Sequence, residues 1–198
     1  KKILIRGVVI VYRRLFADYL PVNEQEEKDK ELILSFINKN NDALSRDNLA
    51  AHVTASAFVI NKTMEKILFV YHKIYNSWSW VGGHNDGDPD LLKVAIKEAK
   101  EETGVTEIEP YQDSIFTLDV IYVPNHIKNG SYVSDHLHLN AAFLLFADDL
   151  QKLTVNLQET KDVRWFYISE VLDHVSEPRM IPVYQKAFSK IKAIRNGI

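Results

Sequence analysis

Three glutamates stand close together in the middle of the chain: Glu98, Glu101 and Glu102. In a helix, the i, i+3 and i+4 spacing places three carboxylates on one side, where like charges repel each other. Carboxylate oxygens are the ligands that hard divalent cations prefer, and Mg²⁺ typically adds phosphate oxygens and water. The cluster is therefore a candidate metal site. The alternative is a solvated acidic helix face that Lys97 and Lys100 partly balance.

A helix over residues 89–103 is expected to carry these carboxylates. Asp88 is predicted as its N-cap and Pro89 as its first residue, because both residue types are favoured at those positions. Gly104 is expected to end it as the C-cap. Its buried side is predicted from four apolar residues at helical spacing: Leu92, Ala95, Ile96 and Ala99.

A glycine pair, Gly82 and Gly83, precedes the loop that leads into this helix, and glycine lets the backbone approach a ligand closely. Gly83 stands 21 residues before Gly104. Aligned on these two glycines, residues 97–105 read KEAKEETGV. This pattern resembles the Nudix box, Gx5Ex7REUxEExGU, in which U is an aliphatic residue. The predicted strand, loop and helix also fall where that motif requires them.

Two positions depart from the box. Pro89 stands where the motif has its first glutamate, and Lys97 stands where it has arginine. In the family these two residues often form an ion pair that orients the loop and the helix. Because both partners are replaced here, neither charge need be left unpaired. We expect the departures to affect the geometry of the site and its rate more than metal binding.

The resemblance extends beyond the box, over about residues 30 to 175. The segments that carry it resemble one bacterial Nudix subgroup with a helical N-terminal extension: HVTASA at 52–57, GGH at 82–84, DGD at 86–88, LL at 91–92 and HLHL at 136–139. The resemblance implies an α/β/α sandwich with a mixed sheet. It also implies Mg²⁺- or Mn²⁺-dependent cleavage of a pyrophosphate bond in a nucleoside diphosphate linked to another moiety.

The same resemblance suggests roles for individual residues. Glu98 and Glu102 are the expected metal ligands, Glu101 is a ligand or the catalytic base, and the carbonyl of Gly82 is a further ligand. Glu159 matches a catalytic carboxylate that family enzymes often add from a later loop. A base has to reach its water, which spacing alone does not show. An ordinary surface-loop residue is the alternative for Glu159.

Substrate contacts are predicted for two histidines and one tryptophan. His84 follows the glycine pair, and His138 shares a face with His136 if residues 136–146 form a strand. Imidazole donates hydrogen bonds to phosphate, and Trp78 is expected to stack on a base, with core packing as its alternative. A histidine-only zinc site is another possibility, but spacing fixes no third ligand. Structural roles are expected for the remaining histidines: His52, His72, His126 and His174.

The chain is expected to divide into a helical extension over residues 1–48 and a Nudix domain over residues 49–198. In the extension, residues 8–19 favour a helix, although residues 3–11 also read as a strand. Residues 24–38 favour an amphipathic helix with Leu32, Ile33, Phe36 and Ile37 on its apolar side. Strands are predicted at 52–60, 66–71, 78–81, 114–122, 136–146 and 163–166, the first two as a hairpin, with a closing helix at 179–195.

Composition narrows the function classes. The chain has 198 residues, 46% of them hydrophobic and 26% charged, as in ordinary globular proteins. A net charge of -3 argues against binding to a nucleic-acid polymer, so a small nucleotide-like substrate is the expected partner, with a homodimer possible. The lack of cysteine excludes disulfides, thiolate zinc sites and cysteine nucleophiles. It also argues against an isoprenoid diphosphate isomerase of the Nudix fold, whose chemistry usually relies on cysteine.

Cellular location is read from the same features. A chain without cysteine fits a reducing compartment, and no apolar run approaches the ~20 residues that a membrane span needs. The basic and apolar start resembles a signal peptide, but Arg6 interrupts it and no small-residue cleavage site follows. We therefore expect a cytoplasmic protein without a membrane partner. The competing function is a Nudix-fold nucleotide-binding or sensor module with little or no catalysis.

Overall fold

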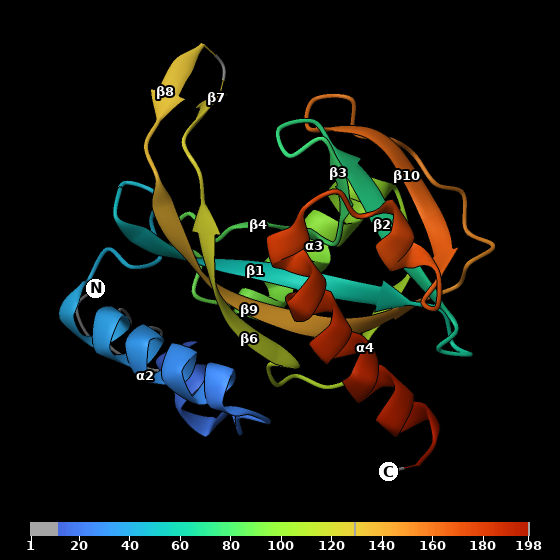
Figure 1. The fold of residues 1–198 in the computed structure, drawn as a ribbon, viewed down its shortest axis with the longest axis horizontal. Coiled ribbons are helices and arrows are strands. Elements are labelled where there is room, and N and C mark those ends of the chain that lie inside the picture. Colours follow the sequence, from blue (N-terminus) through green and yellow to red (C-terminus); the bar gives the residue numbers. More distant parts are fainter. Residues whose placement is uncertain (1–11, 129, 198) are drawn as a thin grey trace.

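An eight-stranded mixed sheet forms the centre of the computed structural model, which describes residues 12–128 and 130–197 (Figure 1). Its strands are β1 (Ala51–Ile60), β2 (Lys66–His72), β3 (Ser77–Ser79), β4 (Val81–His84), β5 (Ile108–Pro110), β6 (Thr117–Val123), β9 (His136–Ala147) and β10 (Thr160–Tyr167). The order across the sheet is β10-β2-β1-β9-β5, with β3 beside β2, β4 beside β1 and β6 beside β9. β1 and β9 run parallel, and the other pairs described within this sheet are antiparallel.

Helices cover both faces of this sheet, as the predicted α/β/α sandwich requires. One hydrophobic cluster contains residues of α2 (Glu24–Lys39) and α3 (Leu91–Thr103), and the other contains residues of α4 (Ile181–Arg195). Two short 3₁₀ helices, Val171–His174 and Pro178–Met180, lead into α4. The predicted fold class is confirmed. Within the described residues, no helix is both long enough and apolar enough to span a bilayer.

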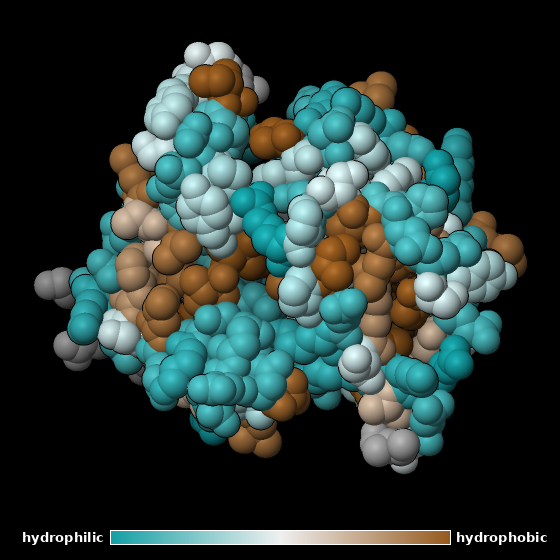
Figure 2. Space-filling model, in the orientation of Figure 1, coloured by the Kyte–Doolittle hydropathy of each residue, from teal (hydrophilic) through white to brown (hydrophobic). Residues whose placement is uncertain are grey.

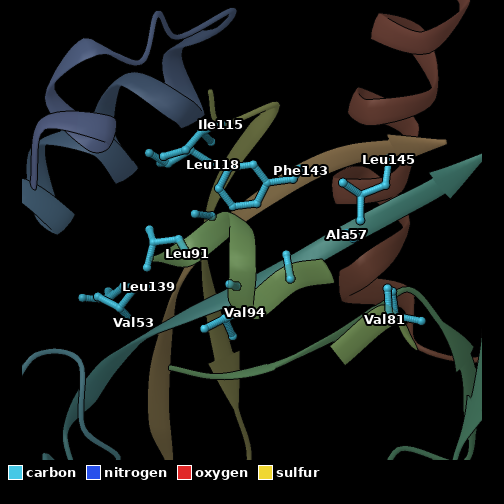
Figure 3. Close-up of a cluster of buried hydrophobic side chains, with 14 of the residues drawn as sticks. Val53, Ala57, Val81, Leu91, Val94, Ile115, Leu118, Leu139, Phe143 and Leu145 are labelled. Carbon is cyan, nitrogen blue, oxygen red and sulfur yellow. The ribbon is translucent and has the colours of Figure 1, made fainter. Parts of the chain in front are cut away.

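Side chains along β1 alternate between the two faces of the sheet, so this strand contributes both to the hydrophobic core and to a polar surface. Val53, Ala55, Ala57 and Val59 face the α3 side, where Val53 lies near Leu91 and Leu139 and Ala57 lies near Leu145 (Figure 3). Phe58 and Ile60 belong to the cluster under α4. Because side chains two residues apart share a face, His52, Thr54 and Ser56 lie on the same face as Phe58. The first half of that face is therefore polar.

Most predicted elements are found, with shifted boundaries. The β1–β2 hairpin is confirmed by the antiparallel pairing of Val59 with Leu68. The single short strand predicted at 78–81 is two strands, β3 and β4, and the glycine pair belongs to β4 instead of a loop. The described part of the first predicted helix, residues 12–18, is helical, whereas the strand considered for residues 3–11 lies outside the described residues.

The start of α3 differs from the prediction. The helix begins at Leu91, and its N-cap is Asp90, whose side chain accepts a hydrogen bond from the Lys93 amide at 3.0 Å. Asp88 instead accepts from the Asp90 amide at 3.0 Å, so it shapes the turn before the helix. Pro89 therefore precedes the helix. The predicted C-cap is confirmed, since Gly104 adopts the left-handed conformation with φ of 77°.

A second, two-stranded sheet lies between β6 and β9. β7 (His126–Lys128) pairs with β8 (Ser131–Val133), and together they form an arm that projects from the molecule (Figure 1). Hydrophobic surface appears at the end of this arm among hydrophilic residues (Figure 2), and Ile127 on the arm is exposed. The arm stands beside the polar half of the β1 face.

The N-terminal helix α2 packs on the core, as its apolar stripe predicts. Ile33 and Ile37 are fully buried in the same cluster as residues of α3 and β1. Leu32 is exposed, and Leu34 packs against the cluster in its place. The extension and the remainder of the chain thus share one hydrophobic core, and the division between residues 48 and 49 stays a prediction.

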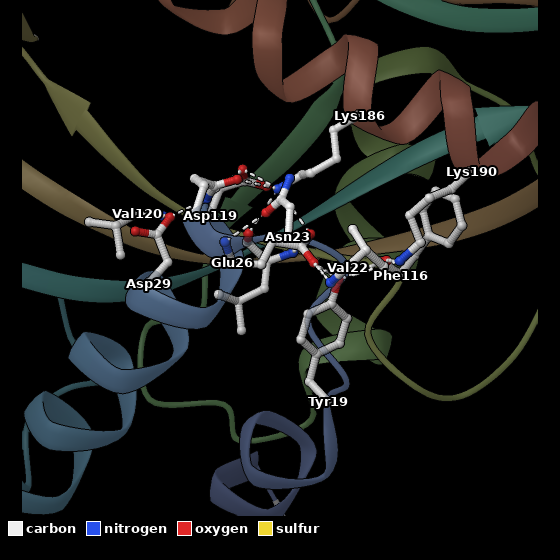
Figure 4. Close-up of polar contacts among 12 residues, drawn as sticks. Tyr19, Val22, Asn23, Glu26, Asp29, Phe116, Asp119, Val120, Lys186 and Lys190 are labelled. Atoms are coloured by element: carbon white, nitrogen blue, oxygen red, sulfur yellow. Dashed lines mark hydrogen bonds and ion pairs between the residues drawn. The ribbon is translucent and has the colours of Figure 1, made fainter.

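A buried group of charges joins α2 to the rest of the molecule, and its pattern was not recognised in the sequence. Lys186 on α4 lies 2.9 Å from Glu26 on α2 and 2.7 Å from Asp119 on β6 (Figure 4). Tyr19 donates a hydrogen bond to Glu26 at 2.7 Å. Burial raises the pKa of Asp119 to about 6, despite the attraction of Lys186. Burial also opposes ionisation of Glu26, but hydrogen bonds from Tyr19, the Val22 amide and Lys186 lower its pKa overall.

Replacing Lys186 by methionine is expected to destabilise the protein by about 3–5 kcal/mol, because two carboxylates would stay buried without their cation. The side chains of Lys186, Glu26 and Asp119 are 8%, 0% and 3% exposed, so water cannot substitute for the lysine. Urea unfolding measures the change. Lys192→Met, at an exposed position on the same helix, is the matched control and should stay within about 0.5 kcal/mol of the natural protein. Equal effects of the two changes would contradict the assigned role.

Candidate functional site

A cavity of about 830 Å³ opens over the polar half of the β1 face. It is bounded by β1, β4 and β9, by α3, by the β7–β8 arm and by the turn before β10. Seven of the eight residues predicted for the site line it: Gly82, His84, Glu98, Glu101, Glu102, His138 and Glu159. The fold therefore brings together residues that are separated widely in sequence.

Glu102 is the most deeply buried of the three glutamates. It is 3% exposed, and its Oε2 accepts a hydrogen bond from the backbone amide of Gly82 at 3.0 Å. Burial raises the pKa of Glu102 to about 8, and repulsion from Glu98 and Glu159 acts in the same direction. The Gly82 hydrogen bond opposes that rise. A carboxylate in this position favours either a proton or a nearby cation.

Glu98 and Glu101 differ in exposure. The side chain of Glu98 is 15% exposed and burial raises its pKa, whereas that of Glu101 is 54% exposed. Lys97 donates to Glu98 at 3.1 Å and to Glu101 at 2.9 Å. The lysine that replaces the arginine of the box is thus paired with two carboxylates of the cluster. Glu102 has no such partner in these contacts, so the donor set fits a divalent cation.

The glycine pair explains how α3 and β4 come so close. A Cβ atom on Gly83 would lie 2.6 Å from Cδ of Glu98. A Cβ atom on Gly82 would lie 2.6 Å from Oγ of Ser56 and 2.7 Å from the carbonyl oxygen of Ala55, which belongs to the neighbouring strand. Gly83 therefore makes room for the side chain of a candidate ligand, and Gly82 makes room for backbone.

The two glycines therefore predict different outcomes when each is replaced by alanine. Gly83→Ala is expected to keep the fold, because the end of a side chain can move, and to weaken Mg²⁺ or Mn²⁺ binding by about 10-fold or more, because Glu98 is displaced. Gly82→Ala is expected to lower the melting temperature, because the backbone of β1 cannot move aside. Calorimetric metal titration and thermal unfolding of both variants check this. Unchanged metal affinity in folded Gly83→Ala would argue against Glu98 as a ligand.

Glu159 lies in the turn before β10, and the structure brings it to the same cavity as the α3 carboxylates. Its Oε1 lies 3.7 Å from Nζ of Lys128 on β7. Glu159 also contributes to the raised pKa of Glu98 and Glu102, which places its charge within electrostatic range of both. The cavity therefore contains a further carboxylate besides those of α3, and it is paired with a lysine of the arm.

Basic residues of the cavity were missed in the sequence. Arg46 forms a two-pronged contact with Asp86, with Nε to Oδ1 at 2.7 Å and Nη2 to Oδ2 at 2.6 Å. Arg46, Lys128 and Arg179 all line the cavity. Arg46 lies in a turn, Lys128 on the arm and Arg179 in a short 3₁₀ helix, and no local motif indicated them. Arg46 belongs to the segment assigned to the extension, so that segment contributes directly to the cavity.

Three histidines lie close together in the cavity. The ring centroids of His52, His84 and His138 lie 5.0–5.1 Å from one another. Burial lowers the pKa of His84 to about 3, with a contribution from Arg46, and it lowers the pKa of His52 and His138 as well. At neutral pH these rings are therefore uncharged. His52, expected from the sequence to be structural, lies in this group.

Trp78 is the predicted site residue that the structure does not bring to the cavity. It is 7% exposed and packs edge-on against Phe166 and Tyr71, with ring centroids 4.8 and 5.5 Å apart. Trp80 lines the cavity instead and contacts Phe58 and Tyr184. Trp78 and Trp80 stand two residues apart, and the side chain that the structure places at the cavity is that of Trp80.

Known structures share this fold at low sequence identity. An Ap4A hydrolase from C. elegans superposes with a TM-score of 0.51 and 15% identity, over 74% of this chain and 98% of that one. A NUDIX-family hydrolase from Clostridium perfringens gives 0.50 and 18%, over 71% and 97%. MutT from Methanosarcina mazei Go1 gives 0.50 and 17%, over 72% and 96%. At this identity the likeness shows the fold alone.

Sequence comparison gives the family. None of the curated proteins matches this chain at a significant level. The model of the NUDIX domain, however, matches residues 50–187, which include β1, the glycine pair, α3 and β9. That match covers most of the chain, and it contains the carboxylate cluster and the histidines of the cavity. The chain therefore belongs to the Nudix family.

Proposed function

We propose that this protein hydrolyses a pyrophosphate bond in a nucleoside diphosphate linked to another group, and that it needs Mg²⁺ or Mn²⁺. The observation that carries the proposal is the buried Glu102 and the partly buried Glu98, held against the glycine pair in a cavity with basic side chains. Membership of the Nudix family supports pyrophosphate cleavage in general. The substrate class and the ion are our inference from the residues of the cavity.

Glu98 and Glu102 are proposed as the metal ligands, with the carbonyl of Gly82 as a further ligand and Glu101 as either a ligand or the base. A bound divalent ion neutralises charge on phosphoryl oxygens and lowers the pKa of a bound water. The protein fixes the carboxylates that hold the ion. The Gly82 amide orients Glu102, and Lys97 tethers both Glu98 and Glu101.

Glu101 and Glu159 are the two candidates for the base that takes a proton from the attacking water. Glu101 is half-exposed and Glu159 is 42% exposed, so both have access to water in the cavity. Each is also held by a lysine, Lys97 or Lys128. Single replacements by glutamine separate them, because loss of the base lowers kcat while metal affinity is kept.

The remaining lining residues suit a small anionic substrate with an aromatic base. Arg46, Lys128 and Arg179 supply positive charge for phosphate oxygens. His84 and His138, predicted to contact the substrate, line the same cavity, and Trp80 offers an aromatic face there. A volume of about 830 Å³ is of the size found for small-molecule sites. The expected cytoplasmic location and the homodimer stay predictions.

A substrate panel tests the proposal. Nucleoside triphosphates, dinucleotides and nucleotide sugars are incubated with the full chain, with Mg²⁺, with Mn²⁺ and with a chelator, and the released phosphate or nucleotide is measured. We expect turnover of at least one class that the chelator abolishes. Tight binding of a nucleotide without turnover would favour the alternative, a binding or sensor module. That alternative is worth testing in this chain because Pro89 and Lys97 replace two charged residues of the Nudix box.

A further inference from the structure

Three neighbouring strands each place one histidine in the same part of the cavity. On β1 and β9, which are parallel, His52 stands opposite His138. On β1 and β4, Thr54 stands opposite His84. Because His52 and Thr54 are two residues apart, they share a face of β1, and so His52, His84 and His138 all lie on that face. Strand register, rather than sequence spacing, creates this group.

The ring nitrogens of these histidines are close enough to share an ion. One nitrogen from each of the three rings lies within 4.8 Å of the other two. Zinc holds histidine nitrogens at about 2.0–2.1 Å, so tetrahedral ligands lie roughly 3.4 Å from one another. Zinc binding therefore requires the three rings to turn so that these nitrogens move closer together. The strands that carry them are hydrogen-bonded neighbours, so the backbone already holds the rings in place.

His52 has a hydrogen-bond arrangement typical of a metal ligand. Its Nδ1 lies 3.0 Å from the carbonyl oxygen of Asn48, so Nδ1 carries the proton and donates it. Nε2 then has a free lone pair, and this atom is buried without a hydrogen-bond partner in the described structure. Metal-binding histidines usually donate their second ring N–H to a carbonyl or carboxylate, which fixes the ring and its tautomer. An unpartnered buried nitrogen is otherwise costly.

A fourth histidine holds the ring of His138. Nδ1 of His136 lies 2.8 Å from the carbonyl oxygen of Ser134 and therefore donates to it. Its Nε2 is then an acceptor, and it lies 3.1 Å from Nε2 of His138, which donates to it when both rings are neutral. This leaves Nδ1 of His138 with its lone pair free. His136 thus fixes the orientation of the His138 ring, as hydrogen-bond partners of metal-binding histidines usually do.

We propose that His52, His84 and His138 bind a divalent transition-metal ion of the zinc type, with its fourth position open to the cavity. Three imidazoles suit zinc and the neighbouring first-row transition metals, whereas the carboxylates of α3 suit Mg²⁺ or Mn²⁺. The two sites therefore differ in ligand chemistry. Three protein ligands with one open position are typical of zinc sites that accept water or a substrate oxygen. His84 and His138 would then meet a phosphate through the ion.

Zinc binding to the full chain, without an affinity tag, tests this site directly and needs no substrate. Calorimetric titration with Zn²⁺ is carried out in excess Mg²⁺, which occupies the carboxylates. We expect one zinc ion per chain, and an affinity at least about 100-fold lower in His84→Gln and in His138→Gln. Loss of a residue that only hydrogen-bonds to a ligand already costs about 10- to 100-fold. His72→Gln is the matched control: this histidine lines the same cavity, but it lies on β2 against Tyr75.

The carboxylate variant Glu102→Gln separates this site from the proposed catalytic metal. It should lose Mg²⁺-dependent turnover and keep zinc affinity, so failure of one proposal leaves the other standing. Equal loss of zinc affinity in Glu102→Gln and His138→Gln would overturn the histidine site, as would undiminished affinity in both histidine variants. If those variants do not fold, nitrogen NMR of the natural protein decides. Zinc must then shift the ring signals of His52, His84 and His138 and leave those of His72 and His174 in place.

Discussion

Glu102→Gln is expected to lower the rate of substrate hydrolysis by about 100-fold or more and to raise the melting temperature of the metal-free protein. The first effect follows from the proposed role of Glu102 as a metal ligand. The second follows from burial, since Glu102 is 3% exposed and glutamine avoids burying a charge there. Glutamine also keeps a side-chain oxygen that can accept the hydrogen bond from the Gly82 amide. A gain in stability and a loss of activity from one substitution are typical of a residue selected for its chemistry.

The pH dependence of the stability gain gives a sharper form of this prediction. The folded-state pKa of Glu102, about 8, lies above its ordinary value of 4.5. Stability contributed by such a raised pKa is fully present below the unfolded value and is lost as the pH rises through the folded value. Glutamine imitates the protonated form at every pH. The advantage of Glu102→Gln over the natural protein should therefore grow from about pH 4.5 to about pH 8 and then level off, reaching a few kcal/mol.

Thermal unfolding across this pH range, with and without Mg²⁺, measures both effects. Added Mg²⁺ should stabilise the natural protein more than the variant, most strongly near pH 8, where the ion competes with fewer protons. Glu107→Gln, at an exposed position just beyond α3, is the matched control and should change neither rate nor stability appreciably. Near-natural turnover in Glu102→Gln would contradict the assignment of this carboxylate as a metal ligand.

The carboxylate cluster was predictable because its determinants are local. Helical spacing alone places Glu98, Glu101 and Glu102 together, and the distance from Gly83 to Gly104 is a property of continuous sequence. The histidine group was not predictable in the same way. His52 and His138 meet because β1 and β9 pair in parallel, and no short segment of sequence encodes that register. His52 was therefore expected to be structural, and the zinc alternative lacked its third ligand.

The smaller differences between the predictions and the structure arise where the local sequence allows two readings. The segment before α3 contains both Asp88 and Asp90, either of which suits an N-cap, and the fold uses Asp90 while Asp88 shapes the turn. Trp78 and Trp80 alternate, but the sequence does not say which face of their strand meets the cavity. The helix over 24–39 was predicted from its apolar residues, whereas the burial of Glu26 depends on Lys186, which is distant in sequence. Contacts between elements that are distant in sequence cannot be predicted from the local pattern of one sequence.

Removing the N-terminal extension is expected to cause the largest loss of stability. A chain that begins at residue 46 would expose the core surface that covers Ile33 and Ile37, and it would leave Lys186 without Glu26. It would also lose two backbone acceptors, because the carbonyl of Ala43 accepts from Val53 at 2.7 Å and that of Leu44 accepts from Gly87 at 3.0 Å. We expect this truncated chain to aggregate or to unfold below the temperature of the full chain.

If the truncated chain is insoluble, single substitutions in α2 test how much the extension contributes to stability. Ile33→Ala and Ile37→Ala should each cost about 2–5 kcal/mol, because both side chains are fully buried, whereas Leu32→Ala at the exposed neighbouring position should cost far less. The double variant need not be additive, since the two side chains belong to one cluster. Urea unfolding of the natural protein and these four variants gives the comparison. Equal costs for Leu32→Ala and Ile33→Ala would contradict the packing described for α2.

The extension should also affect substrate choice, because it reaches the cavity beside Gly87. Leu44 supports the loop after β4 through the Gly87 amide, and Arg46 holds the same loop through Asp86. Variants that only loosen the core, such as Ile37→Ala, should lower stability and keep the ranking of substrates. Arg46→Met should keep stability within about 1 kcal/mol, since its ion pair is half-exposed, and should weaken binding of the more highly charged substrates. An unchanged ranking across the nucleotide panel in Arg46→Met would show that the extension serves the core alone.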